Sequence, residues 1–79
     1  MKLSRNIDAP QLIKSLKKFG YEPTRQHGSH IRLTTQQNGQ HHITIPKHDP
    51  LRIGTLNTIL AEVAQHLGIS KQELIDRLF

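Results

Sequence analysis

Residues 21–46, YEPTRQHGSHIRLTTQQNGQHHITIP, decide the fold of this 79-residue chain. Apolar and polar residues alternate around Ile31 and Leu33, and again around Ile43 and Ile45, as they do in strands with one buried face. Glycines near the ends of the polar stretches between these segments are typical of tight turns. The pattern predicts three strands joined by two turns in an antiparallel meander.

The second turn sets the pairing of the last two strands. A two-residue loop would turn the isoleucines of the third strand to the wrong face. A three-residue loop over residues 37–39, with Gly39 in the left-handed region, instead sets Leu33 opposite Ile43. We predict this second register, because it gathers the apolar side chains on one face of the sheet.

The first turn is predicted to use the same device. A three-residue loop over residues 26–28, ending in glycine, brings Tyr21 opposite Leu33. The same register sets Pro23 opposite Ile31 and marks an edge strand, since proline cannot donate to a ladder on both sides. We expect function on or beside the other face of the sheet, which is polar. That face is predicted to carry Glu22, Thr24, His30, Arg32, Thr34, His42 and Thr44.

Amphipathic helices precede and follow the meander. The first helix begins after Asp8, which forms a capping box with Gln11, and it ends at Gly20. The second helix is predicted over roughly residues 55–67, where apolar residues recur at helical spacing. Gly68 then ends it.

A short third helix follows Ser70, which is predicted to form a capping box with Glu73. The element order is therefore α-β-β-β-α-α. This predicts an α+β fold with a three-stranded antiparallel sheet and helices on one face, in a single domain over residues 1–79. The inner face of the third helix is predicted to consist of Leu74, Ile75, Leu78 and Phe79.

Composition and charge narrow the class of protein. The chain has no cysteine and no apolar run long enough for a spanning helix or a signal peptide, so we expect a soluble, cytoplasmic protein without a membrane partner. The formal net charge is +5. Residues 1–54 hold nine of the eleven Lys and Arg but three of the six Asp and Glu, a net charge of +6. Since five of the six histidines also lie there, this part of the chain favours a polyanionic partner.

Four short sequence words carry a family resemblance. In chain order they are Leu12-Ile13 with Leu16-Lys17-Lys18-Phe19-Gly20-Tyr21, Arg25-Gln26-His27-Gly28-Ser29-His30, Ile45-Pro46-Lys47-His48, and Gly54-Thr55-Leu56 with Ile59-Leu60. Over nearly its whole length the chain thereby resembles the HicA (YcfA-like) toxins of bacterial toxin-antitoxin pairs. It departs from them at His27, where another basic residue is common, and in the linker over residues 49–53.

This resemblance implies both a fold and an activity. The family is similar in topology to double-stranded RNA-binding domains, and its members are RNA-cleaving toxins that inhibit translation. The implied partners are mRNA and a HicB-like antitoxin protein. The family's catalytic histidine lies in a Gly-Ser-His word, which corresponds to His30 here.

The chemistry of RNA cleavage suits His30 without a cofactor or a metal. RNA carries its own nucleophile, the 2′-hydroxyl, so cleavage needs a proton acceptor, charge stabilisation at the phosphate and a proton for the leaving oxygen. His30 is the predicted general acid or base. His42 lies four strand steps from it, roughly 13 Å, and is assigned a surface role. The candidate RNA contacts are Arg32, Lys47, His48, Lys14, Lys17 and Lys18.

Three other interpretations of the sequence remain in view. The clustered histidines favour a metal site only weakly, because neighbouring strand residues point to opposite faces and no cysteine completes a ligand set. Residues 62–78 match a DNA-binding helix-turn-helix, but residues 55–79 have a net charge of −1, so we expect no sequence-specific DNA binding. A non-catalytic double-stranded RNA binder would use the lysines of the first helix and leave His30 without a role. Lys17 and Lys18 also suit a helix C-terminus through the dipole alone.

Overall fold

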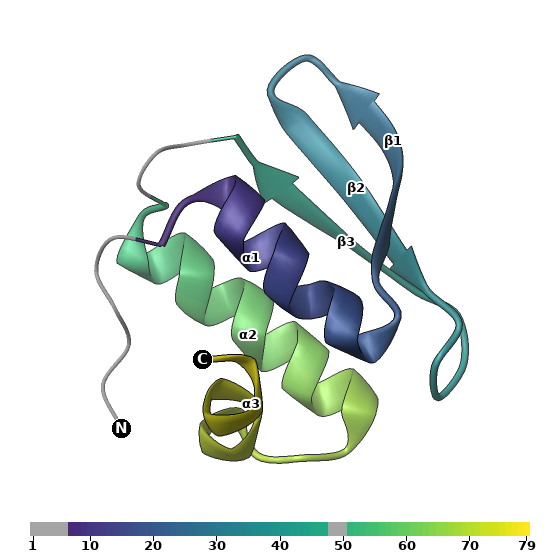
Figure 1. The fold of residues 1–79 in the computed structure, drawn as a ribbon, viewed down its shortest axis with the longest axis vertical. Coiled ribbons are helices and arrows are strands. Elements are labelled where there is room, and N and C mark those ends of the chain that lie inside the picture. The colour runs from purple at the N-terminus through teal and green to yellow at the C-terminus, as the bar shows by residue number, and fades with distance from the viewer. Residues whose placement is uncertain (1–6, 48–50) are drawn as a thin grey trace.

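The computed structural model describes residues 7–47 and 51–79, and the elements follow the predicted order (Figure 1). The strands form one antiparallel sheet in the order β1-β2-β3. Helices α1 and α2 lie against the same face of this sheet, and the other face is open. The α+β fold with the order α-β-β-β-α-α is therefore confirmed. The elements are α1 (Ala9–Leu16), the 3-10 helix η1 (Lys17–Phe19), β1 (Glu22–His27), β2 (His30–Thr35), β3 (His41–Pro46), α2 (Ile53–Leu67) and α3 (Lys71–Leu78).

Helix α1 begins with the predicted capping box. The Asp8 carboxylate accepts a hydrogen bond from the Gln11 N–H at 2.8 Å, and the Gln11 side chain accepts one from the Asp8 N–H at 3.0 Å. The α-helical geometry ends at Leu16, and the last turn tightens into η1 before Gly20, whose φ is 80°. Gly20 therefore ends the helical segment, as predicted, through a 3-10 turn.

Gly20 also lies close to a buried hydroxyl. A Cβ atom at this position would come within 2.9 Å of Thr35 Oγ1. That hydroxyl donates to the Phe19 carbonyl at 2.8 Å and accepts from the Gln37 N–H at 3.1 Å. The end of the first helical segment is thus joined to the end of β2 at a point that has room only for glycine.

The pairing of β2 with β3 follows the predicted register. Leu33 lies opposite Ile43 and Ile31 opposite Ile45, and Gly39 has a φ of 94° in the turn between them. The side chains of Leu33, Ile43 and Ile45 are buried. The requirement that the isoleucines of β3 face the core therefore selects the register.

The predicted pairing of β1 with β2 is wrong. His27 lies opposite His30, so the connecting turn consists of Gly28 and Ser29 alone, and Pro23 lies opposite Leu33 rather than Ile31. Gly28 has a φ of 61°. Glycine at the first central position of a two-residue loop gives a backbone twist that matches the twist of the strands.

A β-bulge at Thr24 compensates for the shorter turn. The register shifts between Pro23 and Arg25, so one extra residue lies on the β1 side of the ladder. Tyr21 precedes β1 and is fully buried, although it does not pair with Leu33 as predicted. β1 is an edge strand, as Pro23 indicated.

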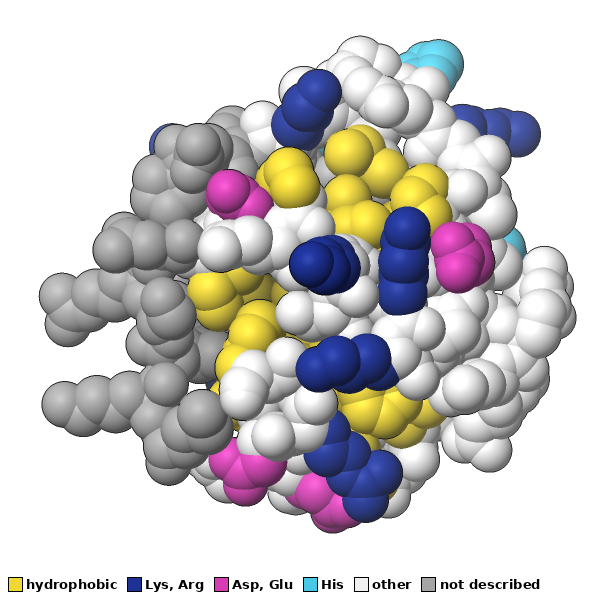
Figure 2. Space-filling view, viewed as in Figure 1, with side chains coloured by type: hydrophobic (Ala, Val, Ile, Leu, Met, Phe, Trp, Pro, Cys, Tyr) yellow, Lys and Arg dark blue, Asp and Glu magenta, His cyan; other side chains and the backbone are white. Residues whose placement is uncertain are grey.

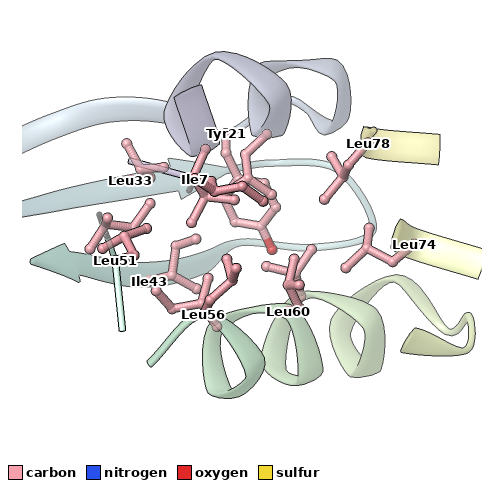
Figure 3. Close-up of a cluster of buried hydrophobic side chains, with 14 of the residues drawn as sticks. Ile7, Tyr21, Leu33, Ile43, Leu51, Leu56, Leu60, Leu74 and Leu78 are labelled. Atoms are coloured by element: carbon pink, nitrogen blue, oxygen red, sulfur yellow. The ribbon is translucent and has the colours of Figure 1, made fainter. Parts of the chain in front are cut away.

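The core lies between the sheet and the helices, as Figure 3 shows. Helix α2 begins at Ile53, two residues before the predicted start. It ends at Gly68, as predicted, where the backbone is left-handed with a φ of 72°. Leu74, Ile75 and Leu78 of α3 are buried, but Phe79 is 40% exposed and does not belong to the inner face. The core side chains labelled in Figure 3 are Ile7, Tyr21, Leu33, Ile43, Leu51, Leu56, Leu60, Leu74 and Leu78.

The capping of α3 differs in one respect from the prediction. The Ser70 hydroxyl accepts from the Glu73 N–H at 3.0 Å, which confirms Ser70 as the N-cap. The Glu73 carboxylate instead pairs with Arg77, one turn further along the same helix. An arginine four residues away satisfies the carboxylate as a charged pair, and the reciprocal half of the capping box does not form.

Candidate active site on the open face of the sheet

A cavity of about 250 Å³ lies on the open face of the sheet, beside the β1–β2 turn. All three strands contribute to it, because alternate residues of a strand share one face. Among the described residues no acidic side chain lines it. The lining residues are Arg25 and His27 of β1, His30 and Arg32 of β2, and Thr44 of β3.

The backbone fixes the position of His30. It is the first residue of β2, and it is paired with His27 on one side and with Pro46 on the other. The Lys47 N–H donates to the Ser29 carbonyl at 2.6 Å, so the end of β3 is tied to the β1–β2 turn. His30 is exposed and Arg32 is half-buried, so a ligand on this face can reach both.

The bulge brings two residues into the site that the sequence prediction missed. Beyond Thr24 the ladder pairs Arg25 with Arg32 and His27 with His30, which sets both β1 residues on the open face. The predicted register had left His27 in the loop and Arg25 off this face. The sequence did carry a signal for this turn, because Gly28 followed by Ser29 fits a two-residue loop. Gly28 also fits the last position of a three-residue loop, which is the loop that was predicted.

A second cavity of about 430 Å³ adjoins the first along the open face. Arg25 and Arg32 line both cavities, so these two side chains lie at the boundary. His42 lies at the far end, opposite Thr34, and its Nδ1 is 2.8 Å from the Thr34 hydroxyl. His42 therefore lies four strand steps from the position of His30, as the predicted register required. The lining residues are Thr24, Arg25, Arg32, Thr34, Gln36, Gln40 and His42.

The lysines predicted to bind RNA do not all lie beside this face. Lys14, Lys17 and Lys18 are exposed on α1 and η1, in the helical layer. Figure 2, seen from the helical side, shows Lys and Arg side chains gathered over α1 and toward α3. Lys18 Nζ lies 3.3 Å from the Leu78 carbonyl oxygen and 3.5 Å from that of Arg77. Lys18 therefore caps the C-terminus of α3.

Two of the predicted contacts follow β3. Lys47 is exposed and comes directly after Pro46, the residue opposite His30. Its backbone bond to Ser29 keeps this part of the chain beside the β1–β2 turn. The structure thus brings Arg32 and Lys47 to the end of the sheet that carries His30. His48 lies outside the described residues.

A separate group of side chains joins the β2–β3 hairpin to α2. The Tyr21 hydroxyl lies 2.8 Å from His41 Nδ1, and the His41 ring stacks on the His66 ring with centroids 4.4 Å apart. His66 Nε2 donates to the carbonyls of Gln37 at 2.8 Å and Gly39 at 3.0 Å. These bonds hold the turn against the C-terminal end of α2.

Two pKa values in this group are shifted. Burial raises the pKa of Tyr21 to about 12, and the negative charge of Glu62 adds to the shift. Burial lowers the pKa of His41, and His66 and His42 lower it further, against an opposing effect of Glu62. Both shifts favour the neutral forms of Tyr21 and His41, whose hydroxyl oxygen and Nδ1 lie 2.8 Å apart.

Residues 62–78 do form two helices joined by a turn at Gly68. Helix α3 turns Leu74, Ile75 and Leu78 into the core, and the Arg77 side chain on its outer side is paired with Glu73. The charged pair leaves this helix little attraction for phosphate.

In residues 7–47 and 51–79, no three His, Asp or Glu side chains form a group that could hold a metal ion. None of the helices in the same residues is long and apolar enough to cross a membrane.

Comparisons with known proteins identify the family. Neither the curated proteins nor the solved structures yield a match to this chain. The model of a protein family described as the HicA toxin of bacterial toxin-antitoxin systems matches residues 9–68, which span α1, the whole sheet and α2. A toxin role and an antitoxin partner accompany that membership. The chain belongs to the HicA toxin family.

Proposed function

We propose that the chain is a metal-independent endoribonuclease that cuts mRNA in the cytoplasm and so inhibits translation, with His30 as general acid or base. One observation carries the proposal. The cavity on the open face gathers His30 with Arg25 and Arg32, and among the described residues no carboxylate lines it. Membership of a toxin family supports the same conclusion, and we propose a HicB-like protein as the antitoxin.

The arrangement suits attack by the 2′-hydroxyl of RNA on the adjacent phosphate. A histidine can accept the hydroxyl proton or supply a proton to the leaving oxygen near neutral pH. Guanidinium groups bind phosphate oxygens through paired hydrogen bonds and stabilise the negative charge that develops there. Arg32 is half-buried, so less water screens its charge than at a fully exposed position. Attack by an internal nucleophile requires no metal-bound water.

The two adjoining cavities offer a path for a single strand of RNA. A strand along the open face would set one phosphate beside His30 and pass Arg25 and Arg32 toward the polar residues of the second cavity. Lys47 would meet the strand at the turn end of the sheet. We keep His48 as a candidate contact on its place in the sequence. Lys14, Lys17 and Lys18 lie in the helical layer and would contact only a longer or folded RNA.

The first experiment is RNA cleavage by the purified chain in the presence of a chelator. We expect products with a 2′,3′-cyclic phosphate, or its hydrolysis product, and a 5′-hydroxyl. His30→Ala should lower the rate by about 10²- to 10⁴-fold. His42→Ala is the comparison variant: it removes a histidine of the second cavity four strand steps away, so it should weaken RNA binding and leave the rate at saturating RNA unchanged. A metal-dependent cut that leaves a 5′-phosphate would contradict the proposal.

The same variants separate the alternative functions. If His30→Ala binds double-stranded RNA as the unaltered chain does, and neither protein cuts RNA, the chain is a binding module. If the isolated chain binds operator DNA, and Asp76→Lys changes that affinity, the helix-turn-helix interpretation is correct. Expression in cells adds a further readout, because the unaltered chain should arrest growth and a folded His30→Ala variant should not.

A further inference from the structure

The cavity holds two histidines rather than one. His27 ends β1 and His30 begins β2, and they face each other across the two-residue turn of Gly28 and Ser29. Both side chains line the same cavity. We propose that His27 is a second catalytic residue, so that a pair of histidines performs the cleavage. This inference rests on the ribonuclease function proposed above.

The register gives the two imidazoles a common target. Residues directly opposite each other on one face of an antiparallel pair have Cβ atoms about 4.5–5.5 Å apart. In an in-line displacement the attacking and leaving oxygens lie on opposite sides of the phosphorus, so one side chain cannot contact both. Two adjacent imidazoles that project from the same face can each approach one of these oxygens.

The proton balance closes with two histidines. One neutral imidazole takes the proton of the 2′-hydroxyl while the 2′-oxygen forms its bond to phosphorus. The bond from phosphorus to the 5′-oxygen breaks, and the leaving oxygen takes a proton from the other histidine, which starts as an imidazolium. The products are a 2′,3′-cyclic phosphate and a 5′-hydroxyl. The two histidines end with their protonation states exchanged, and water restores them.

The neighbouring charges favour a phosphate between these histidines. Arg25 lies opposite Arg32, two residues along each strand from the histidine pair and on the same face. Like charges directly opposite in a sheet destabilise it, and no acidic side chain lines the cavity among the described residues. A bound phosphate would relieve this repulsion. The two arginines and two histidines therefore surround a position that suits an RNA phosphate.

The test compares His27→Gln and His30→Gln on two RNA substrates, with Lys71→Gln, on α3 and outside both cavities, as the control. Glutamine keeps a hydrogen-bonding side chain at each position but transfers no proton. The first substrate is an RNA oligonucleotide that the unaltered chain cuts. The second has sulfur in place of the bridging 5′-oxygen at that cut, so its leaving group needs no proton. Circular dichroism and urea unfolding check that each variant folds.

We expect both variants to cut the first RNA about 10²- to 10⁴-fold more slowly than the unaltered chain. On the sulfur-containing RNA, the variant that lacks the general acid should cut at a rate within about tenfold of the unaltered chain's rate. The variant that lacks the general base should stay slow on this substrate. If His27→Gln cuts ordinary RNA at the unaltered rate while His30→Gln does not, His27 is not catalytic and the ribonuclease function stands. Equal losses by His27→Gln and His30→Gln on both substrates would make His27 a binding residue. If the unaltered chain cuts no RNA, the proposed function fails and this inference fails with it.

Discussion

At the scale of single residues, Tyr21 connects the core to the β2–β3 hairpin. Its ring is fully buried and its hydroxyl bonds to His41. Tyr21→Phe should lower the free energy of unfolding by about 1 kcal/mol at neutral pH, because His41 Nδ1 loses its partner. Urea unfolding followed by circular dichroism measures this change. An unchanged midpoint would show that water replaces the hydroxyl without cost.

The same substitution should change the alkaline limit of stability. An unfolded tyrosine loses its proton near pH 10, whereas burial raises the pKa of Tyr21 to about 12 in the folded protein. The neutral hydroxyl therefore contributes stability below pH 10 that is lost as the pH rises toward 12. The fall in stability over this range should be smaller in Tyr21→Phe. Equal slopes for the two proteins would contradict the assignment.

His41 should limit stability on the acid side. Its pKa is lowered in the folded protein, chiefly by burial, so the unfolded chain binds the proton more tightly. The stability that neutral His41 contributes is present above about pH 6.5, the ordinary histidine pKa, and is lost as the pH falls below that value. His41→Gln should therefore show a weaker dependence of the urea midpoint on pH between 7.5 and 5. Exposed His27, changed to Gln, is the control, because it lies at the opposite end of the sheet from His41.

At the scale of elements, Gly20 sets how the first helical segment turns into β1. Its φ of 80° strains any other residue, and a Cβ atom would approach Thr35 Oγ1 to 2.9 Å. Gly20→Ala should therefore cost about 1–3 kcal/mol of unfolding free energy. Gly68→Ala is the matched comparison, with a φ of 72° and no atom within 4 Å of the added carbon. If the two variants lose the same stability, the contact with Thr35 contributes nothing.

The elements also separate what the sequence could predict from what it could not. The pairing of β2 with β3 was predictable because only one register buries Ile43 and Ile45. No such requirement acts on β1, where all six residues are exposed. Gly28 then fitted either a two-residue or a three-residue loop, and the compensating bulge at Thr24 leaves no mark in the apolar pattern.

The candidate site was predictable from the sequence on β2 but not on β1. His30 and Arg32 lie on β2, whose facing follows from its buried residues, and they share the open face as predicted. Arg25 and His27 lie on β1 and were missed, because their facing depends on the bulge. Lys18 was considered as a phosphate contact or a partner of its own helix end, but its carbonyl partners belong to α3, 59 and 60 residues away. Such a tertiary contact has no local signal.

At the scale of the whole molecule, cations lie on two sides. Arg25 and Arg32 lie on the open face, whereas Lys14 and Lys17 lie in the helical layer. One flat antitoxin surface cannot meet both sets. We expect the antitoxin to cover the open face with an acidic surface, so Arg32→Glu should slow association by about tenfold and also slow RNA cleavage.

Two variants on other surfaces serve as controls. Lys14→Glu should slow antitoxin association less than Arg32→Glu, and Asp76→Lys should change neither association nor cleavage. On-rates measured at two salt concentrations should fall with added salt for the unaltered chain. A larger effect of Lys14→Glu would place the antitoxin on the helical layer instead.

The exposed strand β1 makes the chemistry more fragile than the fold. All six of its residues are exposed and its ladder is interrupted at Thr24, so its opening costs less free energy than unfolding of the core. Arg25 and His27 leave the site whenever β1 opens. Amide hydrogens of β1 should therefore exchange with solvent deuterium faster than those of α2. On warming, the rate of RNA cleavage should fall at a lower temperature than the helical circular dichroism signal. Heating would thus abolish the catalytic activity before it unfolds the protein.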